Sequence, residues 1–446
     1  MPAVCHATET RRLLRFASSS HHDAVWVAAT MLPQELLDLI IGHLDGDIPS
    51  LKSCALTSTA FLPSSQKGIF SRIYVSSIPP SSLSGHSFEN LYTLLSTSPH
   101  IAPLITSFEL SLHHQSEESE FEKIPLFLPF LCNVHRFFLL SATNLIFEWK
   151  TLPVRVQESL VSFWHASNII DLQIEAMGHM TFDEGSRLGM GGWGSLKHLS
   201  ILWSSPERLW ERGSLRSPQL ESLTVGYFNL DLIKYAGLDI SSVRRFSAAI
   251  EIEDDASAVP KIQDFLARFQ DTLEYLHLEM ILHMTAIDFQ MRYNYFDLYQ
   301  CRNLRVVHIG IDMPQDLFPF TRLSPSVQEI TIEVSFKPQM YPDCCKWSVI
   351  DSSIGEQDLP SLFLVKLDIH VSRNTLASCS LAICACEADG SIDVWEVKRN
   401  MPILHSKGIL KVDIKPSEYR GFRVGIRFAY GSSQERTLWS NIHSIW

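Results

Sequence analysis

The sequence lacks the features that mark several broad classes of protein. Lys and Arg (37 residues) are outnumbered by Asp and Glu (49), the net charge is −12, and no block of basic residues occurs. Nucleic-acid binding needs such blocks to neutralise phosphates, so we expect no nucleic-acid partner. The nine cysteines are odd in number and lack the spacing of a disulfide framework. We therefore expect reduced thiols and a cytoplasmic or nuclear protein.

Long apolar runs are also missing. The most apolar window, from Ile124 to Leu140, is interrupted by two prolines and by Asn133, His135 and Arg136. Such a window predicts buried core, because a membrane span needs about 20 uninterrupted apolar residues. We expect no membrane partner. Residues 1–30 combine arginines and serines with acidic residues, and we expect a disordered extension rather than a transit peptide.

Catalytic and ligand-binding motifs are scarce. The Gly-rich run from Gly185 to Gly194 lacks the Gly-Lys-Ser/Thr of a phosphate-binding loop and predicts an inter-element loop. The pair His113-His114 beside residues 115–122 predicts a solvated acidic loop. The cysteines nearest one another do not form C-x2-C pairs, as zinc sites usually do: Cys344, Cys345, Cys379, Cys384 and Cys386. We expect no catalytic residue, no metal and no cofactor, and hence a non-enzyme.

The most informative stretch runs from Leu32 to Phe70. Pro33 suits the first turn of a helix, where its missing N–H is not needed. Apolar residues then recur at helical spacing in two rows, one formed by Leu36, Ile40 and Leu44 and the other by Leu37 and Ile41. Ser50 is a candidate cap for a second helix, and Phe61 to Phe70 predict a third. Three short helices cannot bury this much apolar surface alone, so the rest of the chain or another protein must cover it.

This pattern resembles an F-box of the fungal type: Leu-Pro, a carboxylate, a leucine/isoleucine helix, an acidic turn, and L-x-x-C-x-L. Phe61 stands where the family more often has Trp, and Ser58 and Thr59 stand where it often has Arg. The resemblance implies docking on a Skp-type adaptor, and through it on a cullin. The residues expected to make or support that contact are Leu32, Pro33, Leu36, Ile40, Leu44, Leu51, Cys54 and Leu56. The alternative is an ordinary helical cap on a repeat domain.

A second pattern, apolar-x-x-apolar-x-apolar, recurs along the chain. Its ten copies begin at Ile105, Val134, Ile169, Leu196, Leu220, Val243, Leu273, Leu304, Val327 and Leu362. The end of each copy alternates as a half-buried strand does. Amphipathic helical stretches are expected at 88–98, 156–167, 261–272 and 289–301. The copies resemble degenerate leucine-rich repeats, which implies a curved stack with a parallel sheet on its inner wall. The alternative is a non-repetitive α/β protein.

The C-terminal residues depart from this pattern. Residues 380–400 predict a β-hairpin turning at Asp389-Gly390, and two further strands are expected around 408–415 and 421–431. The predicted organisation is therefore an α/β chain: a disordered extension (1–30), a three-helix F-box (31–75), an irregular leucine-rich-repeat solenoid (86–375), and a β-rich, antiparallel C-terminal cap (376–446).

By resemblance, the expected function is that of the substrate-recognition subunit of a Skp–cullin–F-box ubiquitin ligase. The alternative is a repeat-based interaction scaffold without a role in ubiquitin transfer. Strand alternation assigns one side chain in two to the inner wall, where an unidentified protein client would bind. The candidate client-binding residues are Glu109, Phe138, Asp171, Glu175, Trp203, Tyr275, Glu279 and Glu333. Because carboxylates predominate among them, we expect a basic or amphipathic client segment.

Overall fold

A computed structural model describes residues 33–77, 87–114, 116–141, 147–178, 194–202, 219–226, 239–252, 258–282, 296–311, 320–336, 347–372 and 394–417. The chain forms an α/β structure around a twelve-stranded sheet in which the strands follow one another in chain order. All pairings in this sheet are parallel. The strands are β1 (Arg72–Ser76), β2 (Ser107–Leu112), β3 (Arg136–Ser141), β5 (Asp171–Glu175), β7 (His198–Leu202), β8 (Ser222–Val225), β9 (Arg245–Ile252), β10 (Tyr275–Leu282), β12 (Val306–Ile311), β14 (Glu329–Phe336), β15 (Leu364–Ser372) and β16 (Leu410–Ser417).

Each of the ten recurring hexapeptides contributes to one of these strands, from β2 to β15. The alternation also holds, because the last apolar residue of a copy points into the core while its neighbours point away. The residues expected to face the core are 0–2% exposed: Leu110, Leu139, Ile174, Ile201, Val225, Leu278, Ile309, Ile332 and Leu367. One continuous hydrophobic core therefore runs behind the sheet from β1 to β15.

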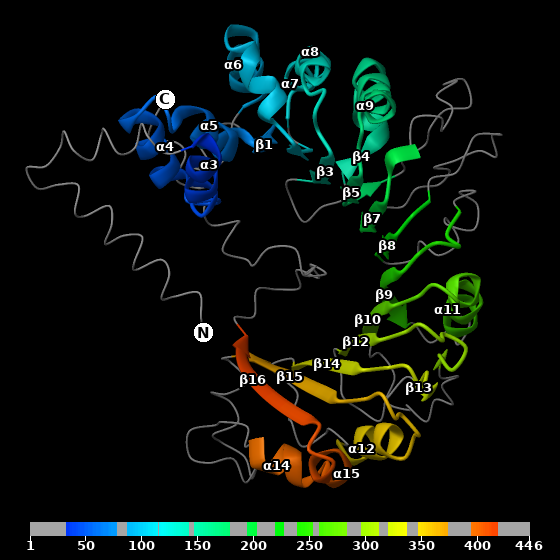
Figure 1. Ribbon diagram of the computed structural model, residues 1–446. Coiled ribbons are helices and arrows are strands. Elements are labelled where there is room, and N and C mark those ends of the chain that lie inside the picture. The colour runs from blue at the N-terminus through cyan, green and yellow to red at the C-terminus, as the bar shows by residue number, and fades with distance from the viewer. Residues whose placement is uncertain are drawn as a thin grey trace, which may run out of the picture.

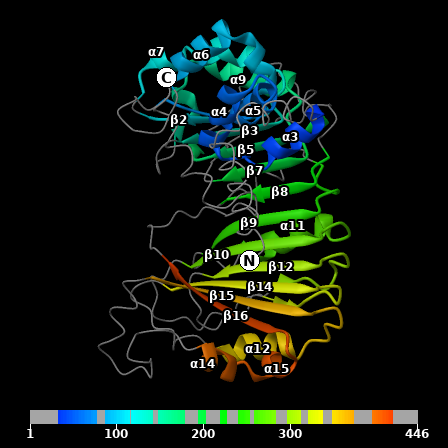
Figure 2. The same cartoon turned by 60° about the vertical axis from the view of Figure 1, so that its left-hand side comes forward.

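The described helices that connect successive strands from β1 to β15 cover only one face of the sheet (Figure 1). The sheet curves into an arc, with α6 (Phe88–Thr97), α8 (Ile124–Phe127), α9 (Val154–Ala166), α11 (Ala258–Leu266) and α12 (Trp347–Gly355) on its outer side (Figure 1). Aromatic side chains join helices to strands: the ring of Phe137 lies 5.9 Å from that of Phe108 and 5.4 Å from that of Phe163. Figure 2 shows the strands stacked one above another along the arc. Parallel sheets are normally covered on both faces, so an inner face without described helices is unusual.

Polar side chains link successive units at a recurring position, three residues before a strand begins. Ser242 donates to the carbonyl of Leu220 (3.0 Å), Thr272 to that of Val243 (2.8 Å), and Ser326 to that of Leu304 (2.9 Å). Asn133 donates in the same way to Pro103, and Asn303 to Asp271. Each bond satisfies a turn carbonyl of the preceding unit and so ties one unit to the next.

At the N-terminal end of the sheet lie α3 (Gln34–Gly42), α4 (Ile48–Thr57) and α5 (Leu62–Phe70), here called the helical unit. The prediction that Ser50 caps the second helix was wrong. Asp47 is the cap, and its Oδ1 accepts the N–H of Ser50 at 3.2 Å. A carboxylate three residues upstream satisfies that N–H better than a hydroxyl inside the first turn could. Pro49 then falls in the first turn, where proline is tolerated.

The helix expected at 289–301 is not found in its described part. Phe296–Asp297 form the two-residue strand β11, which pairs with β13 (Phe320–Arg322) in a small separate sheet. A second such pair joins β4 (Phe147–Glu148) to β6 (Met177–Gly178). The other helical predictions agree with α6 and α9 and, more loosely, with α11 followed by the 3-10 turn η5 (Ala267–Phe269). Among the described helices, none is long and apolar enough to cross a bilayer.

The C-terminal prediction is corrected in two respects. Residues Val394–Arg399, expected as the second strand of a hairpin, form the helix α14, and α15 (Pro402–Ser406) follows. The strand β16 was expected, but it pairs parallel with β15 and extends the main sheet instead of forming an antiparallel cap. The intervening helices provide the crossover that a parallel partner requires. Residues 380–393 and 421–431 lie outside the described part.

Candidate interaction surfaces

The helical unit exposes large apolar side chains on its outer surface. Leu39 and Leu56 are 62% and 89% exposed, and Leu36 and Ile40 are each 46% exposed. Leu62, on α5, adds a fifth at 36%. Several large apolar side chains exposed on one small unit are typical of an interaction site, because water-exposed leucine costs free energy that a partner can recover.

This surface rests on a small core. Ile41, Ile48 and Leu51 are its buried members, and Leu44, Cys54, Phe61 and Ile69 pack around them. The helices α4 and α5 approach closely at Gly68, where an added Cβ would lie 2.9 Å from a Leu51 methyl group. A larger residue at Gly68 would push the two helices apart.

Polar contacts fix α3 against α5. The Asp38 carboxylate accepts hydrogen bonds from the Ser64 hydroxyl and, at 2.8 Å, from the Gln34 amide. These bonds favour the ionised form and lower the pKa of Asp38. The unit also touches the sheet, since Arg72 of β1 pairs with Asp45 at 3.2 Å. Hydrogen bonds therefore join α3 to α5, and an ion pair joins the turn after α3 to the sheet.

The residues predicted to contact or support an adaptor separate into two groups. Pro33, Leu36, Ile40 and Leu56 are exposed, whereas Leu51 is 1% exposed and belongs to the core. Leu44 and Cys54 are half-buried beside that core. Leu32 lies outside the described residues. Leu39 and Leu62 were not predicted as site residues. Leu39 could have been, because it lies outside both apolar rows of its helix and so faces a third direction.

The second surface is the side of the sheet that faces away from the core, here called the inner face. The strand register arranges its side chains in three rows. The middle and C-terminal rows run from β1 to β16, and the N-terminal row runs from β1 to β15. The N-terminal row is Arg72, Ser107, Arg136, Asp171, His198, Ser222, Arg245, Tyr275, Val306, Glu329 and Leu364; the middle row is Tyr74, Glu109, Phe138, Gln173, Ser200, Thr224, Ser247, His277, His308, Thr331, Lys366 and Lys411; and the C-terminal row includes Ser76, Ser111, Leu140, Glu175, Leu202, Ala249, Glu279, Gly310, Glu333, Asp368 and Asp413.

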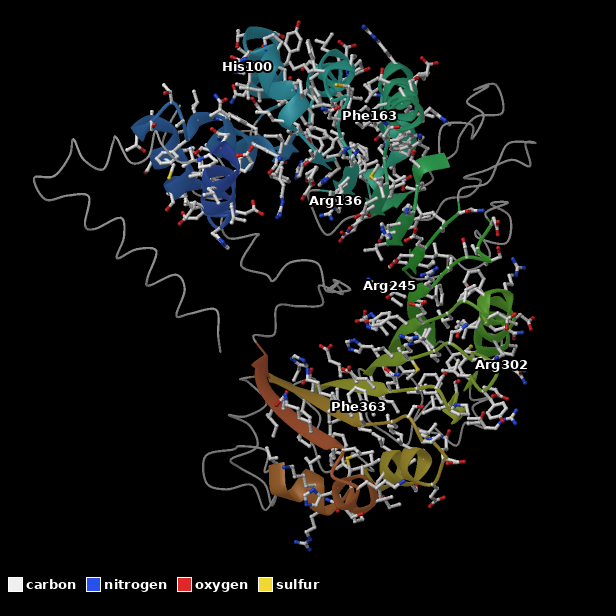
Figure 3. All side chains as sticks on the ribbon, viewed as in Figure 1. His100, Arg136, Phe163, Arg245, Arg302 and Phe363 are labelled. Atoms are coloured by element: carbon white, nitrogen blue, oxygen red, sulfur yellow. The ribbon has the colours of Figure 1, made fainter. Side chains whose placement is uncertain are left out.

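Charge is unevenly distributed over these rows. Arginines occur in the N-terminal row, and Figure 3 shows Arg136 and Arg245 on the inner side of the arc. The C-terminal row carries carboxylates and, among its described members, no Lys or Arg. The middle-row lysines lie near its far end, where Lys366 pairs with Asp368 at 2.6 Å and Lys411 with Asp413 at 3.2 Å. The inner face is thus polarised along the strand direction.

A cluster of imidazoles surrounds Glu333. The Nε2 atoms of His370 and His308 lie 3.0 and 3.4 Å from its two carboxylate oxygens. The two neighbouring imidazoles, against the effect of burial, hold the pKa of Glu333 well below its usual range. The ring of His277 stacks on His308 at 4.3 Å, and its Nδ1 lies 3.1 Å from the Ser247 hydroxyl. Burial, and secondarily the charge of His308, lowers the pKa of His277 to about 3.

All but one of the predicted client-binding residues lie on this face. Glu109 and Phe138 are directly opposite each other in the middle row, Asp171 and Tyr275 belong to the N-terminal row, and the C-terminal row contains the last group: Glu175, Glu279 and Glu333. Trp203 lies outside the described residues. Burial raises the pKa of Asp171, although His198 and Arg136 act against it.

Several charged residues of the face were not predicted from the sequence, among them Arg245, Lys366, Asp368, Lys411 and Asp413. Applying the same alternation to every strand, β16 included, would have found them.

Metal chemistry finds no support in the part of the chain that the structure describes, since no group of three or more His, Cys, Asp or Glu side chains is arranged to hold an ion there. The rings of His113 and His114 stack at 4.7 Å beside the short helix α7 (Glu118–Phe121). The cysteines discussed for zinc lie outside the described residues. A scan against models of known protein families finds no match to this chain, and a search of curated proteins finds no relative.

Proposed function

We propose that the chain is the substrate-recognition subunit of a Skp–cullin–F-box ubiquitin ligase. In this proposal the helical unit docks on a Skp-type adaptor, which brings a cullin, and the inner face of the sheet holds a protein client. The observation that carries the proposal is the exposed apolar surface of the helical unit, on α3, α4 and α5, in a stretch whose residues resemble an F-box.

The exposed side chains are large enough to drive such a contact. Burying a leucine or isoleucine completely is worth about 1.5–3 kcal/mol. Leu56 and Leu39 retain most of that gain for a partner, and Leu36 and Ile40 retain about half of it. Together they supply several kcal/mol before the entropic cost of association, which is a substantial part of what a specific complex needs. Leu51 contributes indirectly, because it fixes the spacing of α4 and α5.

The finer description of the fold belongs to the same proposal. Twelve parallel strands in chain order, an arc with helices outside, and hexapeptides every 23 to 35 residues fit an irregular leucine-rich-repeat solenoid. The chain then acts by proximity: it holds a client near a ubiquitin-loaded enzyme and performs no bond chemistry itself. Cytoplasm or nucleus is the corresponding location.

The test is a double variant, Ile40→Asp with Leu56→Asp. We expect it to lose co-purification with the Skp-type adaptor and the cullin, because two carboxylates would have to be buried in an apolar interface. The matched control is Val154→Asp with Phe363→Asp, which alters side chains that are 68% and 62% exposed outside the helical unit. Circular dichroism should show both variants folded. Undiminished adaptor binding by the first variant would refute the proposal.

A scaffold without a ligase role is the second possibility, since an inner face can hold a partner whatever the helical unit binds. Reconstitution distinguishes the two. The ligase proposal requires ubiquitin transfer to a client bound by the purified complex, whereas the scaffold binds the same client and transfers none.

A further inference from the structure

The middle of the inner face differs from its two ends. On β7, β8 and β9 the middle row consists of Ser200, Thr224 and Ser247, which we call the hydroxyl patch. On one side the row continues to Phe138 through Gln173, and on the other to His277. The three side chains are small, and they are 9%, 3% and 5% exposed in that order.

Among the described residues, the hydroxyl of Ser200 has no hydrogen-bond partner. The residue is 9% exposed, so the oxygen has lost most of its water as well. Its neighbours Leu199 and Ile201 point into the core, which directs Ser200 to the inner face. Leaving a buried hydroxyl unpaired costs about 1–3 kcal/mol, and native chains rarely retain such a group without a use. Ser247, by contrast, is already paired with His277.

A carboxylate stands at the edge of the patch. Glu175 lies on β5, diagonally across from Ser200, in the C-terminal row. Glu175 accepts a hydrogen bond from the Gln173 amide at 3.2 Å, and among the described residues no Lys or Arg pairs with it. The carboxylate therefore keeps its charge available to a cationic group from outside.

We propose that the hydroxyl patch binds an extended segment of a protein client that carries a lysine or arginine. Ser200 pairs with the main chain of the segment, and Glu175 pairs with the cation. The inference rests on the proposed function in one respect only, that the inner face receives clients.

The dimensions and the charge fit this occupant. Neighbouring strands lie about 4.8 Å apart, so the patch spans roughly 10 Å, which three residues of an extended chain cover. A hydroxyl can both donate to a carbonyl and accept from an N–H, so it suits any main chain regardless of sequence. The absence of Lys and Arg from the described C-terminal row selects a basic segment and disfavours nucleic acid, whose phosphates would meet carboxylates.

The experiment uses the full chain and a phage-displayed library of random twelve-residue peptides. We expect enrichment of peptides rich in Lys or Arg. A selected peptide should bind Ser200→Leu at least about tenfold more weakly, because a leucine blocks the approach and removes the hydroxyl. The matched control is Thr331→Leu, in the same row on β14 and 8% exposed, which should bind within about twofold of the parent.

A second pair of variants keeps the test valid if Ser200→Leu fails to fold. Glu175→Gln preserves shape and removes the charge, so it should weaken binding and flatten its dependence on salt, whereas Glu329→Gln in the N-terminal row should do neither. The inference is overturned if no peptide is enriched, if enriched peptides lack Lys and Arg, or if Ser200→Leu and Thr331→Leu have equal effects.

Adaptor binding is measured on the same preparations. An enriched basic peptide without adaptor binding would refute the proposed ligase function and leave the patch intact. Adaptor binding without peptide enrichment would refute the hydroxyl patch as a binding site and leave the proposed ligase function intact.

Discussion

The helical unit and the sheet differ in how much of their apolar surface is buried. The helical unit has a core of Ile41, Ile48 and Leu51 and leaves leucines exposed outside it. The sheet joins its apolar residues into one continuous core and presents a mostly polar inner face. The first arrangement suits a partner held by burial, and the second suits one selected by charge and hydrogen bonding.

The difference follows from size. A unit of about forty residues cannot enclose its apolar side chains, because too much of its volume lies at the surface. A stack of similar units can, since each one is covered by the next. The exposed apolar residues of the helical unit can therefore bind a partner without leaving its core. The apolar residues of the sheet are already buried in the folded chain.

The largest expected effect comes from cutting the sheet core. Phe137 is fully buried and its ring lies within 6.0 Å of Phe108, Phe163 and Trp164. Phe137→Ala should lower the free energy of unfolding by about 3–5 kcal/mol, because it removes a large side chain and leaves a cavity. Urea denaturation measures the change. The control Phe363→Ala, at 62% exposed, should stay within about 0.5 kcal/mol of the parent.

Adaptor binding by Phe137→Ala, measured at a temperature where the sheet is unfolded, tests whether the helical unit and the sheet fold independently. Survival of binding would show that the helical unit folds independently of the stack. Simultaneous loss would show that the two regions share one folding transition, in spite of their separate cores.

The effect of intermediate size is the dependence of the unfolding free energy on pH, which arises from titratable groups of the inner face. His277 has a pKa of about 3 in the folded chain against 6.5 when unperturbed, because burial disfavours its charged form. Between these values the unfolded chain binds the extra proton, so stability falls as the pH drops below about 6.5. One such group contributes at most about 1.4 kcal/mol per pH unit. Glu333, whose pKa is lowered, adds a loss in the same direction below about 4.5, its ordinary value.

His277→Asn should therefore flatten the dependence of unfolding free energy on pH between 7 and 5, measured by urea titration. His100→Asn is the control, since His100 is exposed at the outer surface (Figure 3) and its loss should leave the slope unchanged. Equal slopes for the parent and His277→Asn would contradict the account.

The strands were predictable from sequence because their signal is local. The copies that begin at Ile105 or Leu304 place apolar residues at the spacing that a one-sided strand needs, and β2 and β12 result. The residues that face the core and those that face away then follow from alternation alone. The inner-face carboxylates, such as Glu175 and Glu279, were found in this way.

The remaining features depend on contacts that sequence spacing does not encode. Val394–Arg399 was read as a strand from its alternating apolar residues, but it forms a helix that takes part in the crossover from β15 to β16. Two further features arise only from tertiary contacts. These are the close approach of Gly68 to Leu51 and the unpaired hydroxyl of Ser200. No local pattern distinguishes these residues from any other glycine or serine in the chain.

The smallest expected effect lies at the junction of the two regions. Arg72 of β1 and Asp45, in the turn between α3 and α4, form an ion pair at 3.2 Å with side chains 42% and 55% exposed. Water and salt weaken a pair this exposed, so a double-mutant cycle with Arg72→Ala and Asp45→Ala should give a coupling energy of only about 0.2–1 kcal/mol. The measurement is the unfolding free energy at low and high salt. A coupling that disappears in about 1 M salt leaves apolar packing of α5 against β1 as the contact that orients the helical unit. A coupling above about 2 kcal/mol would instead make this pair the element that sets the angle at which an adaptor meets the sheet.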